Sequence, residues 1–215
     1  MKYPRIPHLS ASPAVGGDDI VLDSGAPGLL VGREVVVEEK LDGMNVMIRL
    51  VDGAPQVGTR GGADTMDRSG ERGRVAAWAA VHRDELARGL GADRVLFAEW
   101  LLRRHAVPYD KLPAELVGID VYDLAAGRFL AVDERDAALR AIGVARPPVR
   151  FRGVLRALRD LDALFGPSAF GDDVRAEGLI VRPVDGGEPR VIKHVDPAWG
   201  KVGEAPWDGV NRIGT

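Results

Sequence analysis

Residues 34–51 read EVVVEEKLDGMNVMIRLV, two runs rich in β-branched residues around a short polar break. The first run covers residues 34–40 and the second covers residues 45–51. β-Branched side chains favour extended backbone, and Leu41-Asp42-Gly43 between the runs is typical of a tight turn. We therefore predict two neighbouring strands, with Lys40 at the end of the first.

The rest of the chain alternates between strand-like and helix-like patterns. Helices are predicted at residues 73–90, 133–142 and 154–165, and a glycine follows each of them. Further strands are predicted at residues 56–60, 94–102, 115–123, 128–132, 176–182 and 190–195. Residues 1–33 and 196–215 are predicted to be an irregular lead-in and tail. Because there is no internal repeat or low-complexity linker, we expect one α+β domain over residues 1–215, with antiparallel sheets flanked by helices.

Composition excludes several classes of protein. The chain has 215 residues, of which 46% are hydrophobic and 28% charged, so it is long and apolar enough for a packed domain. It has no cysteine, which excludes disulfides, thiolate zinc sites and cysteine nucleophiles. Neither a membrane-spanning run nor a signal-peptide pattern is present, so we expect a cytoplasmic protein with no membrane partner.

The charge balance limits how nucleic acid could be bound. The net charge is −3, so any nucleic-acid surface must be a local patch. Two groups of arginines are candidates for it, with a solvated helix face as the alternative: Arg68, Arg72 and Arg74, and Arg150, Arg152, Arg156 and Arg159. The four histidines have no metal-ligand spacing, and Trp78 and Trp100 are assigned to the core.

Three charged residues fall at strand positions beside apolar neighbours. Alternation along a strand places Glu99 on the face of Val95 and Phe97, Glu177 on that of Leu179 and Val181, and Lys193 between Val191 and Val195. Burying such charges is costly unless they pair with each other, a metal or a ligand. They are therefore either structural ion pairs and exposed strand ends, or parts of a site. In a site, Lys40 near acids and a second lysine suits a covalent nucleophile.

Six segments resemble, in order, the motifs of the covalent nucleotidyltransferase superfamily of RNA ligases, DNA ligases and mRNA capping enzymes. They are Glu39-Lys40-Leu41-Asp42-Gly43-Met44-Asn45, Thr59-Arg60-Gly61, Phe97-Ala98-Glu99, Gly118-Ile119-Asp120-Val121-Tyr122, Glu177-Gly178-Leu179-Ile180-Val181 and Val191-Ile192-Lys193. The resemblance covers residues 34–195. The first motif, together with the start Tyr3-Pro4-Arg5-Ile6-Pro7-His8, is most similar to the RNA ligase branch typified by the second phage-type RNA ligase.

This resemblance implies a nucleotidyltransferase fold, that is, an ATP-grasp-like ligase adenylation domain. DNA ligases and capping enzymes carry an OB domain after the fifth motif. The 22 residues from His194 to Thr215 are too few for an OB barrel, so none is expected here.

The resemblance also implies a reaction and a set of site residues. Lys40 would attack ATP to form lysyl-AMP, AMP would pass to an RNA 5′-phosphate in a nicked or bridged duplex, and a 3′-hydroxyl would seal the strand. Lys193 and Asp42 would serve catalysis, and Glu177 would bind Mg²⁺ or Mn²⁺. Residues expected to bind the nucleotide are Glu39, Asn45, Arg60, Glu99, Ile119 and Ile180. An end-healing kinase–phosphatase is an expected partner.

Two positions depart from the family pattern. Ile119 occupies a base-slot position that is often aromatic, and Val195 replaces the usual second lysine of the fifth motif, for which Lys201 is a candidate substitute. Two alternatives therefore stay open beside the RNA ligase. One is a nucleotide- or strand-end-binding module of the same fold that has lost ligation or needs a partner. The other is a minimal DNA-repair ligase.

Overall fold

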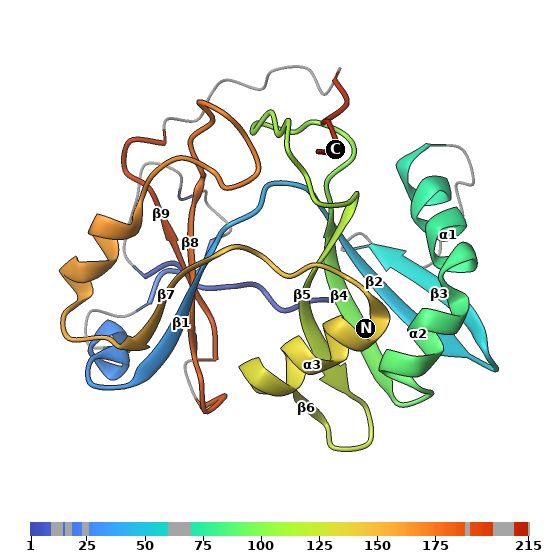
Figure 1. Ribbon diagram of the computed structural model, residues 1–215. Coiled ribbons are helices and arrows are strands. Elements are labelled where there is room, and N and C mark those ends of the chain that lie inside the picture. Colours follow the sequence, from blue (N-terminus) through green and yellow to red (C-terminus); the bar gives the residue numbers. More distant parts are fainter. Residues whose placement is uncertain are drawn as a thin grey trace. The chain divides into compact units, whose positions relative to one another are not determined.

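The computed structural model describes residues 1–9, 15, 19–22, 26–59, 70–187, 190–199 and 209–214. The chain divides into two compact units. Unit 1 consists of Met1–Tyr3, Gly43–Arg103 and Ala114–Arg146, and unit 2 of Pro4–Asp42, Arg104–Pro113 and Pro147–Thr215. Each unit contains one antiparallel sheet with helices, which confirms the α+β class (Figure 1). The single domain expected over residues 1–215 stays a prediction.

Unit 1 is built on a five-stranded sheet in the order β3-β2-β4-β5-β6. Its strands are β2 (Met44–Val51), β3 (Ala54–Thr59), β4 (Arg94–Trp100), β5 (Leu116–Asp123) and β6 (Arg128–Phe129), and its helices are α1 (Glu71–Val81), α2 (Arg83–Leu90) and α3 (Val132–Ile142). Alternate strand residues such as Ile48 and Leu96 join Leu86 of α2 and Leu139 of α3 in one buried cluster. The helices therefore cover one face of this sheet, and the residues between, such as Phe97, belong to the other face.

Unit 2 is built on a four-stranded sheet in the order β7-β1-β8-β9. Its strands are β1 (Glu34–Glu39), β7 (Val149–Val154), β8 (Gly178–Pro183) and β9 (Ile192–Val195), and its 3₁₀ helices are η1 (Ala26–Leu30) and η2 (Leu158–Leu164). Val37, Val181 and Ile192 pack on one face with Leu30 and Leu161 of the 3₁₀ helices. The opposite face carries Glu38, Ile180 and Lys193, which are aligned across β1, β8 and β9.

The lead-in adds backbone pairing at the β9 edge of this sheet. The Lys193 N–H donates to the Pro7 carbonyl at 2.9 Å, and the Leu9 N–H donates to the Lys193 carbonyl at 2.8 Å. The His8 N–H donates to the Ile20 carbonyl at 2.7 Å, and the Leu22 N–H donates to the His8 carbonyl at 2.9 Å. Two segments of the lead-in, residues 7–9 and 20–22, thus continue the sheet beyond β9.

Two predicted helices differ from the structure. The helix expected at residues 73–90 is divided at His82 into α1 and α2, and the His82 ring stacks on Trp78 with 4.1 Å between ring centroids. The helix expected at residues 154–165 is wrong, because Val154 ends strand β7 and only η2 is helical. Leucines 158, 161 and 164 repeat every three residues, which suits the three-residue turn of a 3₁₀ helix. Within the described residues, no helix is long and apolar enough to cross a membrane.

Candidate functional site

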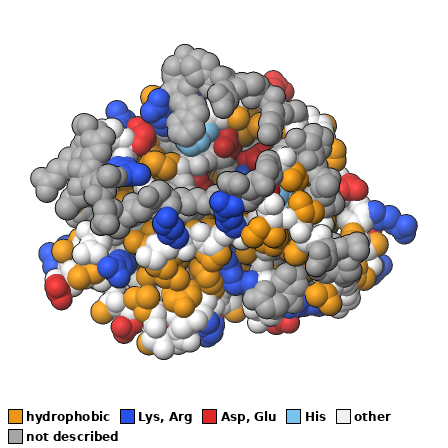
Figure 2. Space-filling view, turned by 180° about the vertical axis from the view of Figure 1, so that it is seen from behind, with side chains coloured by type: hydrophobic (Ala, Val, Ile, Leu, Met, Phe, Trp, Pro, Cys, Tyr) orange, Lys and Arg blue, Asp and Glu red, His pale blue; other side chains and the backbone are white. Residues whose placement is uncertain are grey.

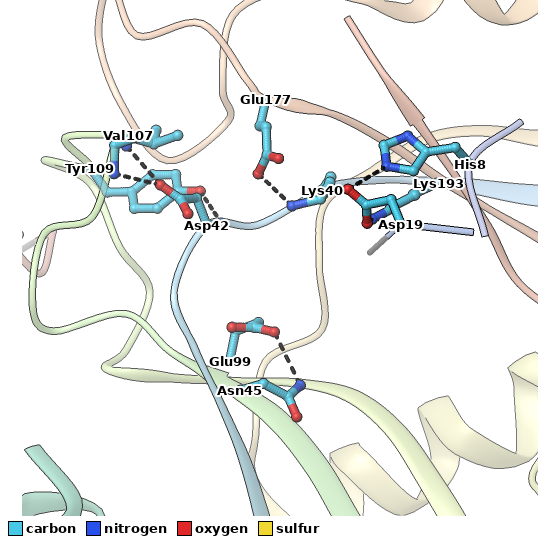
Figure 3. A network of polar contacts seen from close by, with 11 residues as sticks. His8, Asp19, Lys40, Asp42, Asn45, Glu99, Val107, Tyr109, Glu177 and Lys193 are labelled. Carbon is cyan, nitrogen blue, oxygen red and sulfur yellow. Dashed lines mark hydrogen bonds and ion pairs between the residues drawn. The ribbon is translucent and has the colours of Figure 1, made fainter. Parts of the chain in front are cut away.

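Lys40 and Glu177 form an ion pair in unit 2. The Lys40 N–H donates to the Gly178 carbonyl at 2.8 Å, which brings the residue after β1 beside the first residue of β8, next to Glu177. The Lys40 Nζ donates to the Glu177 carboxylate, and the two side chains are only 22% and 17% exposed. The ammonium group is therefore held in one place and largely shielded from water (Figure 3).

Lys193 brings a second ammonium group to the same part of unit 2. It lies on β9 opposite Ile180, and its Nζ donates to Asp19 Oδ1 at 2.8 Å. Figure 3 shows Lys40 with Glu177 on one side and the Asp19–Lys193 pair on the other. Two lysines and two carboxylates thus gather on one side of the unit 2 sheet. Two ammonium groups so placed suit a phosphate-bearing ligand.

His8 lies next to this group and is 2% exposed, with its Nε2 3.6 Å from Asp19 Oδ2. Burial, and then the positive charge of Lys193, hold the pKa of His8 below its usual value, although Asp19 opposes this effect. The imidazole is therefore neutral at pH 7. The positive charge of Lys40 also lowers the pKa of His8, which agrees with both lysines lying near the His8 ring.

Asp42 holds a loop in place. Its Oδ2 accepts the N–H of Ala106 at 2.7 Å and of Val107 at 2.9 Å, and its own N–H donates to the Tyr109 hydroxyl at 2.8 Å. Tyr109 is buried, and burial raises its pKa well above the usual value, so its hydroxyl stays protonated. These contacts give Asp42 a structural task beside Lys40, and its expected catalytic role stays a prediction.

Glu39 is buried and anchors the end of β1. Its carboxylate contacts Arg150 Nη2 at 2.8 Å and accepts the Ala169 N–H at 3.0 Å and the Ser168 hydroxyl. These groups come from β7 and the loop after η2, so Glu39 ties three segments together just before Lys40. This placement favours a supporting task, and the nucleotide contact expected for Glu39 stays a prediction.

Unit 1 carries a second pair of expected site residues. Asn45 on β2 lies directly opposite Glu99 on β4, and its Nδ2 donates to Glu99 Oε1 at 3.2 Å (Figure 3). Glu99 shares its face with Phe97, against which Tyr3 packs at 5.0 Å between ring centroids. Tyr3 in turn donates its hydroxyl to Asp120 at 2.8 Å, so the start of the chain supports this face. Ile119 lies in β5 and is buried.

Several expected residues lie outside the described part of the chain, namely Arg60, Gly61, Arg68 and Lys201. Of the other expected arginines, Arg150 pairs with Glu39, and Arg156 and Arg159 are exposed. On the face drawn in Figure 2, the visible Lys and Arg side chains are interspersed with apolar and uncharged ones. The arginine patch stays a prediction. The assignment of Trp100 to the core is confirmed, since it is buried and its indole N–H donates to Glu71 at 2.6 Å.

The sequence did not point to Asp19 or Tyr109, and it assigned no role to His8. His8 ends the segment Tyr3–His8, whose resemblance to the RNA ligase branch was a signal for its importance. Asp19 lies in a stretch without periodicity, and Tyr109 lies in a loop, so neither had a pattern that could single it out. Among the residues that the structure describes, no group of three or more His, Asp or Glu could hold a metal ion by itself.

The RNA ligase family matches residues 33–196, which is most of the chain. The chain therefore belongs to the RNA ligase family. No curated protein sequence matches it.

Solved structures of an RNA ligase from Naegleria gruberi are similar to it. The ligase with pyrophosphate has a TM-score of 0.64 and 22% identity, over 81% of this chain and 53% of that one. A lysine mutant of that ligase with ATP and Mn has a TM-score of 0.65 and 20% identity, over 92% of this chain and 63% of that one. These similarities show the RNA ligase nucleotidyltransferase fold. The chain spans about half the length of the Naegleria ligase with pyrophosphate.

Proposed function

We propose that the chain is an ATP-dependent RNA ligase that carries AMP on Lys40. The observation that supports this most is the group of Lys40, Glu177 and Lys193 in unit 2, which places a shielded amine beside a carboxylate and a second cation. The chain also belongs to the RNA ligase family over residues 33–196. The Naegleria ligase of the same fold was solved with ATP and Mn and with AMP and Mn, which supports the same nucleotide and metal chemistry here.

In the first step, Lys40 Nζ attacks the α-phosphorus of ATP. A nitrogen–phosphorus bond forms, the bond from the α-phosphorus to the bridging oxygen breaks, and pyrophosphate leaves. Nζ must lose a proton before it attacks, because only the neutral amine has a free electron pair. Glu177 fixes the position of Nζ through their ion pair, and Lys193 balances the negative charge on the phosphoryl group.

The metal site fits Mg²⁺ or Mn²⁺ if Glu177 is its protein ligand. Mg²⁺ is commonly held by one or two carboxylates together with substrate phosphates and water, so a cluster of acids is not required. Glu177 is partly buried, and its carboxylate forms an ion pair with Lys40. A bound cation would withdraw charge from the α-phosphate and make it easier to attack.

The remaining site residues are proposed to bind the nucleotide. Glu99 on β4 and Asn45 on β2 offer an acceptor and a donor from the same face of the sheet and suit ribose hydroxyls. Ile119 and Ile180 are buried apolar residues that suit the faces of the base. Arg60 and Glu39 complete the expected set. Cytoplasmic location and a kinase–phosphatase partner stay predictions.

In the later steps, AMP moves from Lys40 to an RNA 5′-phosphate and forms a 5′–5′ pyrophosphate linkage. A 3′-hydroxyl then attacks the 5′-phosphorus, a phosphodiester forms, and AMP leaves. The substrates are therefore the two ends of an RNA break.

One observation favours a second candidate function. Val195, where the family usually has a lysine, is buried and lies opposite Gly178 at the β8–β9 pair. That position thus supplies no cation to the phosphate group. A module that binds a nucleotide or a strand end, without ligation or with a partner's help, would tolerate this change.

Labelling with α-³²P-ATP and Mg²⁺ tests the proposal. The wild-type protein should gain a covalent label that survives denaturation and alkali, and the mass of one AMP. Lys40→Ala and Lys40→Arg should give no label, because a guanidinium group does not lose its proton near neutral pH. Lys111→Arg is the matched control, since Lys111 is an exposed lysine of the same unit paired with Asp172. Undiminished label in Lys40→Arg would contradict the proposal. Label without sealing of any RNA break would favour the binding module.

A further inference from the structure

Asp19, in the lead-in, forms an ion pair with the Lys193 side chain. Lys193 Nζ lies 2.8 Å from Asp19 Oδ1, and the two side chains are 17% and 31% exposed. A lysine side chain is a flexible four-carbon stem, so its ammonium group has a defined position only if another group holds it. In this structure Asp19 is that group.

Backbone hydrogen bonds make this contact part of the sheet. Lys193 is bonded through both its N–H and its carbonyl to residues 7–9. His8, in the middle of that segment, is bonded through both of its backbone groups to residues 20–22, which follow Asp19 directly. The two charged residues therefore lie on strand-like segments on either side of residues 7–9, and four backbone bonds link the three segments. The Lys111–Asp172 pair differs, since its side chains are 54% and 69% exposed.

The groups around Asp19 favour its ion pair with Lys193. Its other oxygen faces His8 Nε2 at 3.6 Å, and His8 is buried and neutral. Lys40 is the other cation that acts on His8, and it is already paired with Glu177. Asp19 thus holds one ammonium group of the site and Glu177 holds the other, which keeps the two cations in separate, fixed places (Figure 3).

We propose that Asp19 is a positioning residue for Lys193, so that the lead-in takes part in the adenylation step. This inference rests on the proposed function, because it assigns a purpose to Asp19 through the phosphate-binding role of Lys193. Cations that are already in place when charge develops on a transferring phosphoryl group stabilise the transition state most. A lysine released from Asp19 can still reach ATP, but it is not held where the reacting phosphate needs it.

The test is single-turnover formation of lysyl-AMP at several ATP concentrations. Asp19→Ala and the isosteric Asp19→Asn should lower the rate constant at saturating ATP about tenfold, while the ATP concentration for half-saturation changes less than about threefold. Asp19→Glu keeps the charge and should recover the wild-type rate constant to within about threefold. Asp172→Asn, which breaks the exposed Lys111 pair, is the matched control and should label like the wild type.

A double-mutant cycle separates positioning from a general effect on folding. If Asp19 acts through Lys193, Asp19→Ala should change the rate less than about twofold when Lys193→Ala is already present. Additive losses, or Asp19→Ala and Asp19→Asn variants that label as fast as the wild type or faster, would overturn the inference. Faster labelling would identify Asp19 as a competitor of the phosphate instead. No label on the wild-type protein would overturn the proposed function and this inference together, whereas normal label on Asp19→Ala and Asp19→Asn would overturn the inference alone.

Discussion

The acidic side chains around Lys40 in unit 2 make different contacts and therefore have different roles. Glu177 contacts the ammonium group, whereas Glu39 and Asp42 on either side of Lys40 in the sequence make hydrogen bonds to other segments. The loop that Asp42 holds lies in the unit 2 segment Arg104–Pro113 and includes the buried Tyr109. The sequence neighbours of the proposed nucleophile therefore fix its backbone from both sides.

Asp42→Ala should destabilise the protein, because it leaves the N–H groups of Ala106 and Val107 without the carboxylate that accepts them. The loss of two such bonds should cost about 2 kcal/mol and lower Tm by roughly 5 °C in thermal unfolding. Asp42→Asn keeps one acceptor oxygen and should lose about half as much. An unchanged Tm with a complete loss of AMP labelling would instead show that Asp42 acts on the substrate.

How far single residues could be predicted depended on their distance from a recognisable strand. Lys40, Glu177 and Lys193 could be singled out because charged residues at strand ends and in strands stand out against an apolar pattern. Asp19 could not, since it lies 174 positions before Lys193 and follows a stretch that lacks any period. The contact arises only once the lead-in adds to the sheet.

At the scale of elements, the β8–β9 pair connects the two charged positions that the proposed chemistry uses. Glu177 precedes β8, Lys193 lies in β9, and Gly178 faces Val195 between them. A Cβ atom at position 178 would lie 2.4 Å from the His194 carbonyl oxygen and 2.8 Å from Val195 Cα. Only glycine lets the two backbones come this close.

Gly178→Ala should therefore push β9 away from β8. Overpacking of this kind costs about 1–3 kcal/mol, and a lower Tm and weaker AMP labelling should appear together because Lys193 moves with β9. Gly166→Ala is the control in the same unit, since a Cβ there meets nothing within 4 Å. Equal Tm values for the two variants would show that the strands accommodate the methyl group.

The start of α3 in unit 1 is stabilised by Glu134, whose carboxylate pairs with Arg128 and accepts the Ala131 N–H at 3.0 Å. The Arg128 guanidinium, together with this N–H, lowers the pKa of Glu134 from 4.5 to about 2. Because the pKa is lower in the folded state, the contribution to stability is complete above the unfolded-state pKa and is lost as the pH falls through the folded-state value.

Glu134→Gln should thus have a lower Tm than the wild type at pH 7, and the difference should shrink between about pH 4.5 and pH 2. Thermal unfolding across that range measures it. Glu85→Gln on α2, a partly exposed acid near Arg88, controls for the loss of one negative surface charge. A difference in Tm that stays constant with pH would contradict the assigned role.

Most elements could be predicted from the sequence, and the main error has a physical cause. The strands around Lys40 were predicted because β-branched residues dominate them. Strand β7 was missed because arginines alternate with Val149, Phe151 and Gly153 in a short run, and no single residue marks its end. Its strand conformation depends on pairing with β1, where Phe151 lies opposite Val37. Such long-range pairing does not leave a strong local pattern.

At the scale of the whole molecule, a net charge of −3 means that the proposed RNA substrate would be bound through few phosphate contacts. As few as two neutralised phosphates lower the affinity about tenfold when salt rises from 50 to 200 mM. We therefore expect binding of a nicked RNA duplex to weaken by about that factor or more over this range, as measured by fluorescence anisotropy. Salt-independent binding would show that phosphate contacts do not hold the strand.

Sealing of a pre-adenylylated strand without ATP, in the same duplex, tests substrate choice. A 3′ end with a 2′-hydroxyl should be joined faster than a DNA end, because this group distinguishes RNA locally. Equal rates on RNA and all-DNA nicks would favour the DNA-repair ligase.

Each unit is built from three separate stretches of the chain, which limits how this protein can be divided. The chain passes from one unit to the other five times, after Tyr3, Asp42, Arg103, Pro113 and Arg146. Neither unit is a continuous stretch of sequence, so a single gene fragment cannot encode one of them. A recombination event that joins this gene to another at any of the last four points would separate strands of the same sheet. The two units must therefore be inherited, expressed and exchanged between genes together.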